Sequence, residues 1–117
     1  MFPQLPAAVR VFLCTRPTDL RKGFDGLTGL VQECIGQDPL TGHLFLFLNR
    51  RRDRIKILYF DRDGLAIWYK RLESGSFQLP DAVAQDGVEL QPAQLAMLLS
   101  GIDLRSARQR KRFQRAG

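Results

Sequence analysis

The chain has 117 residues, of which 44% are hydrophobic and 26% are charged, as in an ordinary globular protein that forms one domain. Its formal net charge is +6, which makes a polyanion a candidate partner. No apolar run is long enough to span a membrane, and no basic segment followed by an apolar core opens the chain, so we expect a cytoplasmic protein that does not contact a membrane.

The first expected elements are a strand over residues 9–14 and a long helix over residues 19–36. Apolar side chains recur in the second segment at spacings of three and four residues, which places them on one face of a helix. This stripe consists of Leu20, Phe24, Leu27, Leu30, Val31, Cys34 and Ile35. Thr18 is a candidate N-cap, and Gly36 is expected to end the helix.

Glycine recurs at every third position of this helix, at Gly23, Gly26 and Gly29. Each glycine costs a helix about 1 kcal/mol relative to alanine. We therefore expect these glycines to let the helix approach the sheet or a partner closely. Arg21 and Lys22, near the start of the helix, form either its solvent-exposed side or contacts to an anion at its N-terminus.

Three short apolar runs bounded by turn residues follow, and they predict strands over residues 43–48, 55–60 and 65–72. The turn over residues 61–64 begins with Asp and ends with Gly, which is typical of type I. These features predict an antiparallel three-stranded meander. None of the three strands alternates cleanly between apolar and polar residues, so a helix should cover one face of the sheet, and a second element or a second protein the other.

Short strands over residues 76–79 and 88–90 and a helix that begins at Pro92 complete the expected elements. The apolar stripe of this helix is Leu95, Leu98, Leu99 and Ile102, with Gly101 as its C-cap. The fold class we expect is α+β, with an antiparallel meander packed by one long N-terminal helix and followed by a short C-terminal helix. Residues 1–104 should form a single compact domain, and residues 105–117 a flexible basic tail.

Basic residues gather in two places. Eight basic and three acidic residues lie between Arg50 and Arg71. The candidates for nucleic-acid binding in this segment are Arg50, Arg51, Arg52, Arg54, Lys56, Lys70 and Arg71. Residues 1–104 hold twelve basic and twelve acidic residues, so the whole excess of six belongs to the tail. The candidates there are Arg105, Arg108, Arg110, Lys111, Arg112 and Arg115.

Two interpretations of this pattern stay open. Arginines on a hairpin tip reach phosphates as planar forks, and interleaved aromatic residues are typical of nucleic-acid binding, which favours DNA as a partner. Alternatively, the arginines form a solvated turn, the aromatic residues belong to the core and the tail only keeps the chain soluble. The aromatic residues in question are Tyr59, Phe60, Trp68 and Tyr69.

The sequence offers little support for catalysis or metal binding. Asp61 and Asp63 are spaced as metal-binding carboxylates can be, but they lie in a turn that favours aspartate. His43 is the only histidine, and no Ser-His or Cys-His pattern accompanies it. Cys14 and Cys34 lie among apolar residues, which predicts buried, reduced thiols. We therefore expect no catalytic residue, no metal and no cofactor.

Several segments together resemble a known family. They are residues 15–27, 42–64, 69–77 and 88–95, so the resemblance covers nearly the whole chain in order and spacing. The chain resembles the TnpB-type accessory protein that the second open reading frame of the insertion-sequence-66 transposon family of bacteria encodes. This protein is distinct from the RNA-guided nuclease that shares the name TnpB. One departure is Phe60, where the resemblance leads us to expect tryptophan.

The resemblance implies a small non-catalytic protein that supports transposition beside a separate transposase with an acidic catalytic triad. It supplies no catalytic residues, and it leaves open whether DNA, the transposase or another co-encoded protein is the contact. We expect an accessory factor that binds DNA largely independently of sequence or assists transposase assembly. The alternative is a pure protein–protein adaptor, either a homodimer or a protein that docks the transposase, without DNA contact.

Overall fold

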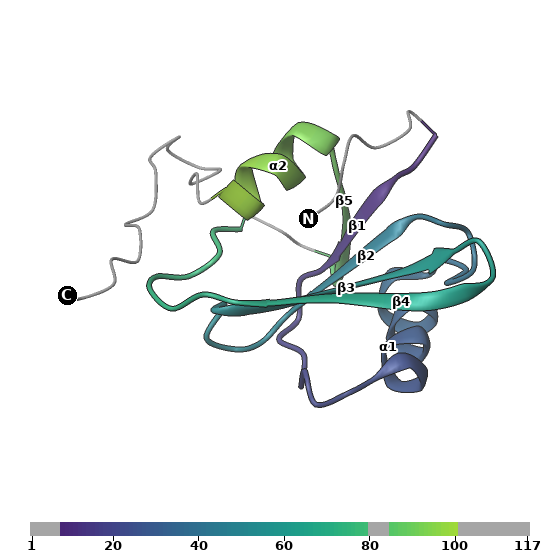
Figure 1. Cartoon of the computed structure of the whole chain (residues 1–117), viewed down its shortest axis with the longest axis horizontal. Coiled ribbons are helices and arrows are strands. Elements are labelled where there is room, and N and C mark those ends of the chain that lie inside the picture. The colour runs from purple at the N-terminus through teal and green to yellow at the C-terminus, as the bar shows by residue number, and fades with distance from the viewer. Residues whose placement is uncertain (1–7, 80–84, 101–117) are drawn as a thin grey trace.

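The computed structural model describes residues 8–79 and 85–100, which form a five-stranded sheet in the order β4-β3-β2-β1-β5 (Figure 1). The strands are β1 (Val11–Cys14), β2 (Leu44–Leu48), β3 (Arg54–Asp61), β4 (Gly64–Arg71) and β5 (Gly87–Leu90). Residues 76–79, for which we expected a strand, pair with none of these. The expected basic tail and its boundary at residue 104 lie outside the described residues and stay predictions.

The predicted fold class is wrong, because the sheet is mixed and both helices are short. β2, β3 and β4 pair antiparallel, and β1 pairs antiparallel with β5, but β1 and β2 run parallel, with Val11 opposite Leu44 and Cys14 opposite Phe47. Parallel neighbours need a crossover connection, and the helical segment between these strands provides it. β1 and β2 are apolar throughout, as parallel strands buried on both faces are.

The first helix starts later than expected. α1 (Phe24–Leu30) continues into a π-helical turn, η1 (Val31–Ile35), and Gly36 ends the segment with a φ of 74°. Asp19 lies outside the helix, because its side chain accepts a hydrogen bond from the backbone N–H of Arg21 at 3.0 Å. This local bond competes with helical hydrogen bonding. Gly23, not Thr18, precedes the first turn.

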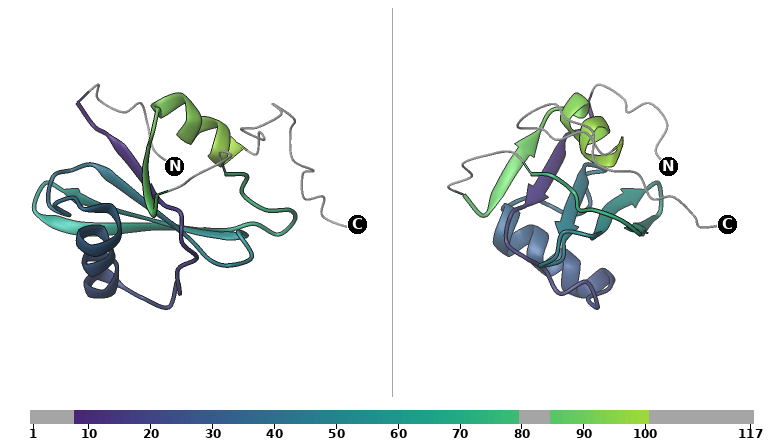
Figure 2. Two further views of the ribbon diagram at one scale, coloured as in Figure 1. Left: turned by 180° about the vertical axis from the view of Figure 1, so that it is seen from behind. Right: turned by 90° about the vertical axis from the view of Figure 1, so that its left-hand side faces the viewer.

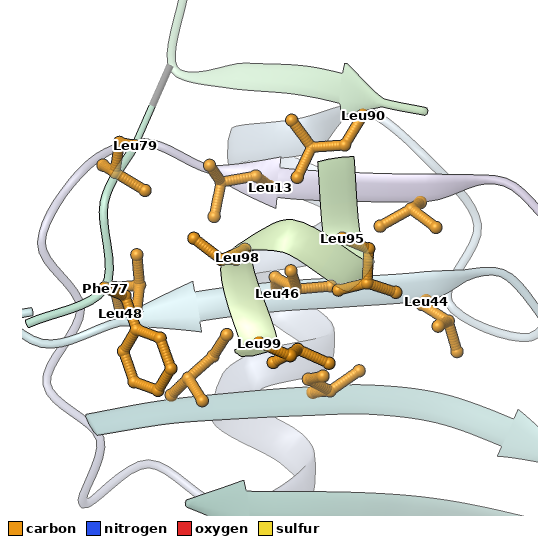
Figure 3. Packing of buried hydrophobic residues seen from close by; sticks show 13 residues of the cluster. Leu13, Leu44, Leu46, Leu48, Phe77, Leu79, Leu90, Leu95, Leu98 and Leu99 are labelled. Carbon is orange, nitrogen blue, oxygen red and sulfur yellow. The ribbon is translucent and has the colours of Figure 1, made fainter. Parts of the chain in front are cut away.

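The two helices cover opposite faces of the sheet, as the views in Figures 1 and 2 show. α1 and η1 pack on one face over a cluster of buried residues that includes Phe45, Phe47 and Leu58. α2 (Pro92–Ser100) begins at Pro92 as expected and covers the other face. Figure 3 shows its contacts: Leu95, Leu98 and Leu99 lie against the leucines of β1 and β2. The chain therefore covers both apolar faces itself.

The β3–β4 turn is not type I. Arg62 has a φ of 58°, and the backbone N–H of Asp63 donates to the carbonyl of Asp61 at 2.6 Å, a γ-turn pattern. Type I turns require negative φ at both central residues, so the Asp and Gly positions alone did not determine the turn.

The helical glycines do not face the sheet. A Cβ on Gly23 or Gly29 would meet nothing within 4 Å, and one on Gly26 would meet only the side chain of Lys22. The expected close approach to the sheet at these positions is therefore wrong, and a close approach to a partner stays a prediction. The close approach occurs at Gly87 of β5, where a Cβ would lie 3.0 Å from the Cα of Ile35.

Candidate nucleic-acid interface

The side chain of Asn49 braces the loop at the tip of the β2–β3 hairpin. The Asn49 Oδ1 accepts hydrogen bonds from the backbone N–H groups of Asp53 and Arg54 at 3.1 and 3.0 Å. The Asn49 Nδ2 donates to the Asp53 carboxylate at 2.6 Å. Arg52 takes the left-handed conformation, with a φ of 60°. These bonds brace the backbone of the loop that carries the arginines.

Three arginines on this tip are exposed to solvent, namely Arg50, Arg51 and Arg52. Within residues 8–79 and 85–100, their side chains form no hydrogen bond and no ion pair. Other arginines have acidic partners: Arg10 pairs with Glu89 at 2.7 Å, and Arg71 with Glu73 at 2.8 Å. The hairpin tip therefore carries positive charges that the described part of the chain does not neutralise.

A groove of about 650 Å³ separates this tip from the loop between β1 and α1. Its lining residues come from both loops and from the adjacent ends of β3 and β4. They are Pro17, Thr18, Asp19, Leu20, Arg21, Asn49, Arg50, Arg51, Asp53, Arg54 and Tyr69. The two walls are joined at the base, because the backbone N–H of Thr18 donates to the carbonyl of Leu48 at 2.8 Å.

The groove is positive at neutral pH. Four arginines and two aspartates line it, so its formal charge is +2. Asp19 holds Arg21 in an ion pair of 2.7 Å, and the hydrogen bonds from Arg21 lower the pKa of Asp19 to about 2. Because this pair neutralises itself, the net positive charge comes from the hairpin side of the groove.

An exposed tyrosine lies among the cations of the groove. Tyr69 is 50% exposed, and Lys56 is its cross-strand neighbour, with Nζ 5.0 Å from the centroid of the phenol ring. This distance lies within the range of a cation–π interaction. Arg54 approaches the other end of the residue, with Nη1 3.4 Å from the Tyr69 hydroxyl. The Lys56 Nζ also donates to the carbonyl of Lys22 at 2.9 Å, which fixes its place.

The structure brings together most, but not all, of the candidate residues that it describes. Arg50, Arg51 and Arg54 line the groove, and Lys56 stands beside them. Lys70 lies on the opposite face of the sheet, because its cross-strand neighbour is Ile55, whose side chain belongs to the core under α2. Arg52 is on the tip but does not line the groove, and Arg71 is paired with Glu73. The six candidates of the tail lie outside the described residues.

The sequence did not place two parts of the groove. It did not separate Tyr69, which lines the groove, from its neighbour Trp68, which packs against the core on the opposite face. The cross-strand register would have separated them, since Lys56 faces Tyr69 and Ile57 faces Trp68. Arg21 was considered as an anion contact at a helix N-terminus, but the helix starts at Phe24, and Arg21 instead pairs with Asp19 in the wall of the groove.

Other kinds of site were also considered in the sequence, namely a metal site and a membrane-spanning helix. In the part of the chain that the structure describes, no three His, Cys, Asp or Glu side chains lie together in a way that could hold a metal ion. Asp61 and Asp63 lie in the β3–β4 turn, at the end of β3 far from the groove. Among the described residues, no helix has the length and apolar character needed to cross a membrane.

Comparison with known proteins points to one family. A family model described as "IS66 Orf2 like protein" matches residues 9–109. "Uncharacterized protein y4hO" of Sinorhizobium fredii is 42% identical over 97 residues, which cover 83% of this chain and 84% of that protein. "Uncharacterized protein y4jC" of the same organism is 35% identical over 95 residues, which cover 81% of this chain and 80% of that protein. No solved structure matches.

Proposed function

This chain belongs to the IS66 Orf2-like family, and on this basis we propose that it is a non-catalytic accessory protein of DNA transposition that binds DNA. The proposed contact surface is the tip of the β2–β3 hairpin together with the groove beside it. The basic residues of the tail, Arg105 to Arg115, would extend this contact along the phosphate backbone. The protein would act in the cytoplasm beside the transposase of its element.

The observation that carries this proposal is the set of unpaired arginines on the tip. Arg50, Arg51 and Arg52 are exposed and have no acidic partner in the described residues, on a loop that Asn49 braces. Arginine forks bind phosphate oxygens in pairs, and displacement of counterions from DNA supplies the free energy of binding. Phosphate contacts fix position without reading bases, so affinity should depend little on sequence.

The competing function is a pure adaptor between proteins. The sequence favoured an adaptor because both faces of the expected sheet are apolar, and a second protein was one candidate to cover the second face. α2 provides that cover with Leu95, Leu98 and Leu99, so the sheet no longer requires a partner. The transposase and other co-encoded proteins, or a second copy of the chain, remain proposed partners in assembly.

Replacement of the three tip arginines tests the DNA contact. We expect the Arg50, Arg51 and Arg52→Ala variant to bind duplex DNA roughly 10- to 100-fold more weakly, since each exposed charge contributes about 0.5–1 kcal/mol. The loss should be equal for the terminal DNA of the element and for random DNA. Gel-shift titration of both duplexes measures it.

Arg62→Ala is the matched control. Arg62 is also an exposed arginine in a hairpin turn, and its φ of 58° is close to the 60° of Arg52. It lies, however, at the opposite end of β3. Its replacement should leave duplex affinity unchanged. If the triple variant kept wild-type DNA affinity but failed to retain the transposase in a pull-down, the adaptor function would replace the one proposed.

A further inference from the structure

The groove beside the hairpin tip combines features that duplex binding does not require. Phosphate contacts to a duplex need only a convex, positive surface, which Arg50, Arg51 and Arg52 already provide. The groove is concave, has a volume of about 650 Å³ and contains a half-exposed aromatic ring, that of Tyr69. This volume lies within the roughly 300–1,000 Å³ of sites that enclose a small molecule.

Tyr69 is held in place while much of its surface stays accessible. Lys56 lies 5.0 Å from the ring centroid, and Arg54 lies 3.4 Å from the hydroxyl, so the ring is oriented from two sides. The residue is nevertheless 50% exposed. A flat group that stacked on the ring would bury apolar surface without requiring the ring to move.

The charges around Tyr69 suit a ligand with phosphates on either side of a flat group. Arg50, Arg51 and Arg54 line the groove with Tyr69, and Arg21 lines the facing wall. Arg21 is paired with Asp19, whereas Arg50 and Arg51 have no partner in the described residues. A stacking ring flanked by unpaired guanidinium groups is the arrangement that binds single-stranded nucleic acid.

We propose that this groove binds an unpaired nucleotide of single-stranded DNA, with the base stacked on Tyr69 and its neighbouring phosphates at Arg50, Arg51 and Arg54. A base inside a duplex is covered by its neighbours and cannot stack on a ring that lines a groove. The groove would therefore distinguish single strands or unpaired ends from intact duplex. This inference rests on the proposed DNA-binding function and adds to it the strand form that is recognised.

The test compares the affinities for one oligonucleotide as a single strand and as a duplex. Loss of one stacked base weakens binding by about 1–3 kcal/mol, which corresponds to roughly 5- to 150-fold. We expect Tyr69→Ala to reduce the preference for the single strand over the duplex by this factor, and Tyr69→Phe to keep it. Phe24→Ala is the matched control, because Phe24 is 48% exposed but does not line the groove.

A second measurement uses the unchanged chain and does not depend on the folding of a variant. An oligonucleotide with 5-iodouracil, irradiated in complex with the wild-type protein, should form a covalent adduct on the peptide that contains Tyr69. Tandem mass spectrometry locates the adduct on Tyr69 and separates it from one on the adjacent Trp68, which lies on the opposite face of the sheet. Adducts on other aromatic residues alone, or an unchanged strand preference in Tyr69→Ala, would overturn the inference.

The outcomes separate this inference from the function on which it rests. If Arg50 and Arg51→Ala weakened duplex binding while Tyr69→Ala left the strand preference intact, the groove proposal would be wrong and the DNA-binding function would stand. If the wild-type chain bound neither form of DNA, both proposals would be wrong.

Discussion

The thiol of Cys14 shows how strongly the fold changes the chemistry of a single residue. Cys14 lies on β1 and is 2% exposed, and its Sγ is 2.8 Å from the Sγ of Cys34. Burial, reinforced by the hydrogen bond with Cys34, raises the pKa of Cys14 to about 11. The sequence predicted buried thiols, and this holds for Cys14, whereas Cys34 is only partly buried.

Alkylation should detect the raised pKa of Cys14. With a pKa of about 11 in place of 9.0, the thiolate fraction at pH 8 is roughly 100-fold smaller than in the unfolded chain. Labelling of Cys14 by iodoacetamide should therefore be slow in the native protein and fast in urea, as peptide mass spectrometry would measure. Equal rates at pH 8 would contradict the burial.

The same shift makes stability depend on alkaline pH. Because the pKa of Cys14 is higher in the folded state, the stability that its neutral thiol contributes is present below about pH 9 and is lost as the pH rises toward 11. Other groups titrate in this range as well. The free energy of unfolding should therefore be measured from about pH 8 to about pH 11 for the wild type and for Cys14→Val. The difference between the two pH profiles isolates the contribution of Cys14.

The residues of the groove illustrate what sequence can and cannot indicate at this scale. Three successive arginines beside a turn are exposed in almost any fold, and the prediction that Arg50, Arg51 and Arg52 are accessible needed no tertiary information. Tyr69 and Trp68 have similar neighbours in the sequence, and only the strand register places one in the groove and the other against the core.

At the scale of elements, a helical glycine and a strand glycine lead to predictions of opposite sign for the free energy of unfolding. Gly29→Ala should raise the free energy of unfolding by about 0.5–1 kcal/mol, because a Cβ there meets nothing within 4 Å and alanine favours a helix. Gly87→Ala should lower it by about 1–3 kcal/mol, because its Cβ would lie 3.0 Å from the Cα of Ile35 and 3.1 Å from the carbonyl oxygen of Cys34.

Urea unfolding followed by circular dichroism measures both variants. The contact that Gly87 makes is with backbone atoms, which cannot move aside as a flexible side chain can. A stabilised Gly87→Ala or a destabilised Gly29→Ala would contradict the packing of η1 against β5 or the exposure of α1, respectively.

Local patterns located the strands better than they determined their pairing. All five strands of the sheet were expected within a few residues of their observed bounds, as were the positions of the meander turns and the start of α2 at Pro92. The parallel pairing of β1 with β2 was missed, because a pairing between segments about 30 residues apart leaves little trace in either segment. Their continuous apolar character was the available signal.

For the whole molecule, the distribution of charge matters more than its sum. Residues 1–104 are formally neutral, and the excess of six lies in the tail. Within the described residues, Arg10, Arg16, Arg21 and Arg71 have acidic partners, whereas the three arginines of the hairpin tip do not. The hairpin tip therefore presents a local positive surface that adjoins the groove.

The most direct test of the central claim is the salt dependence of duplex binding by the full chain and by its Arg50, Arg51 and Arg52→Ala variant. Each phosphate neutralised contributes about 0.9 to the slope of log affinity against log salt. We expect the triple variant to flatten this slope by about three, truncation after Leu104 to flatten it by about four to six, and Arg62→Ala to leave it unchanged. A slope that is identical in the wild type and the triple variant would show that the hairpin arginines do not contact DNA.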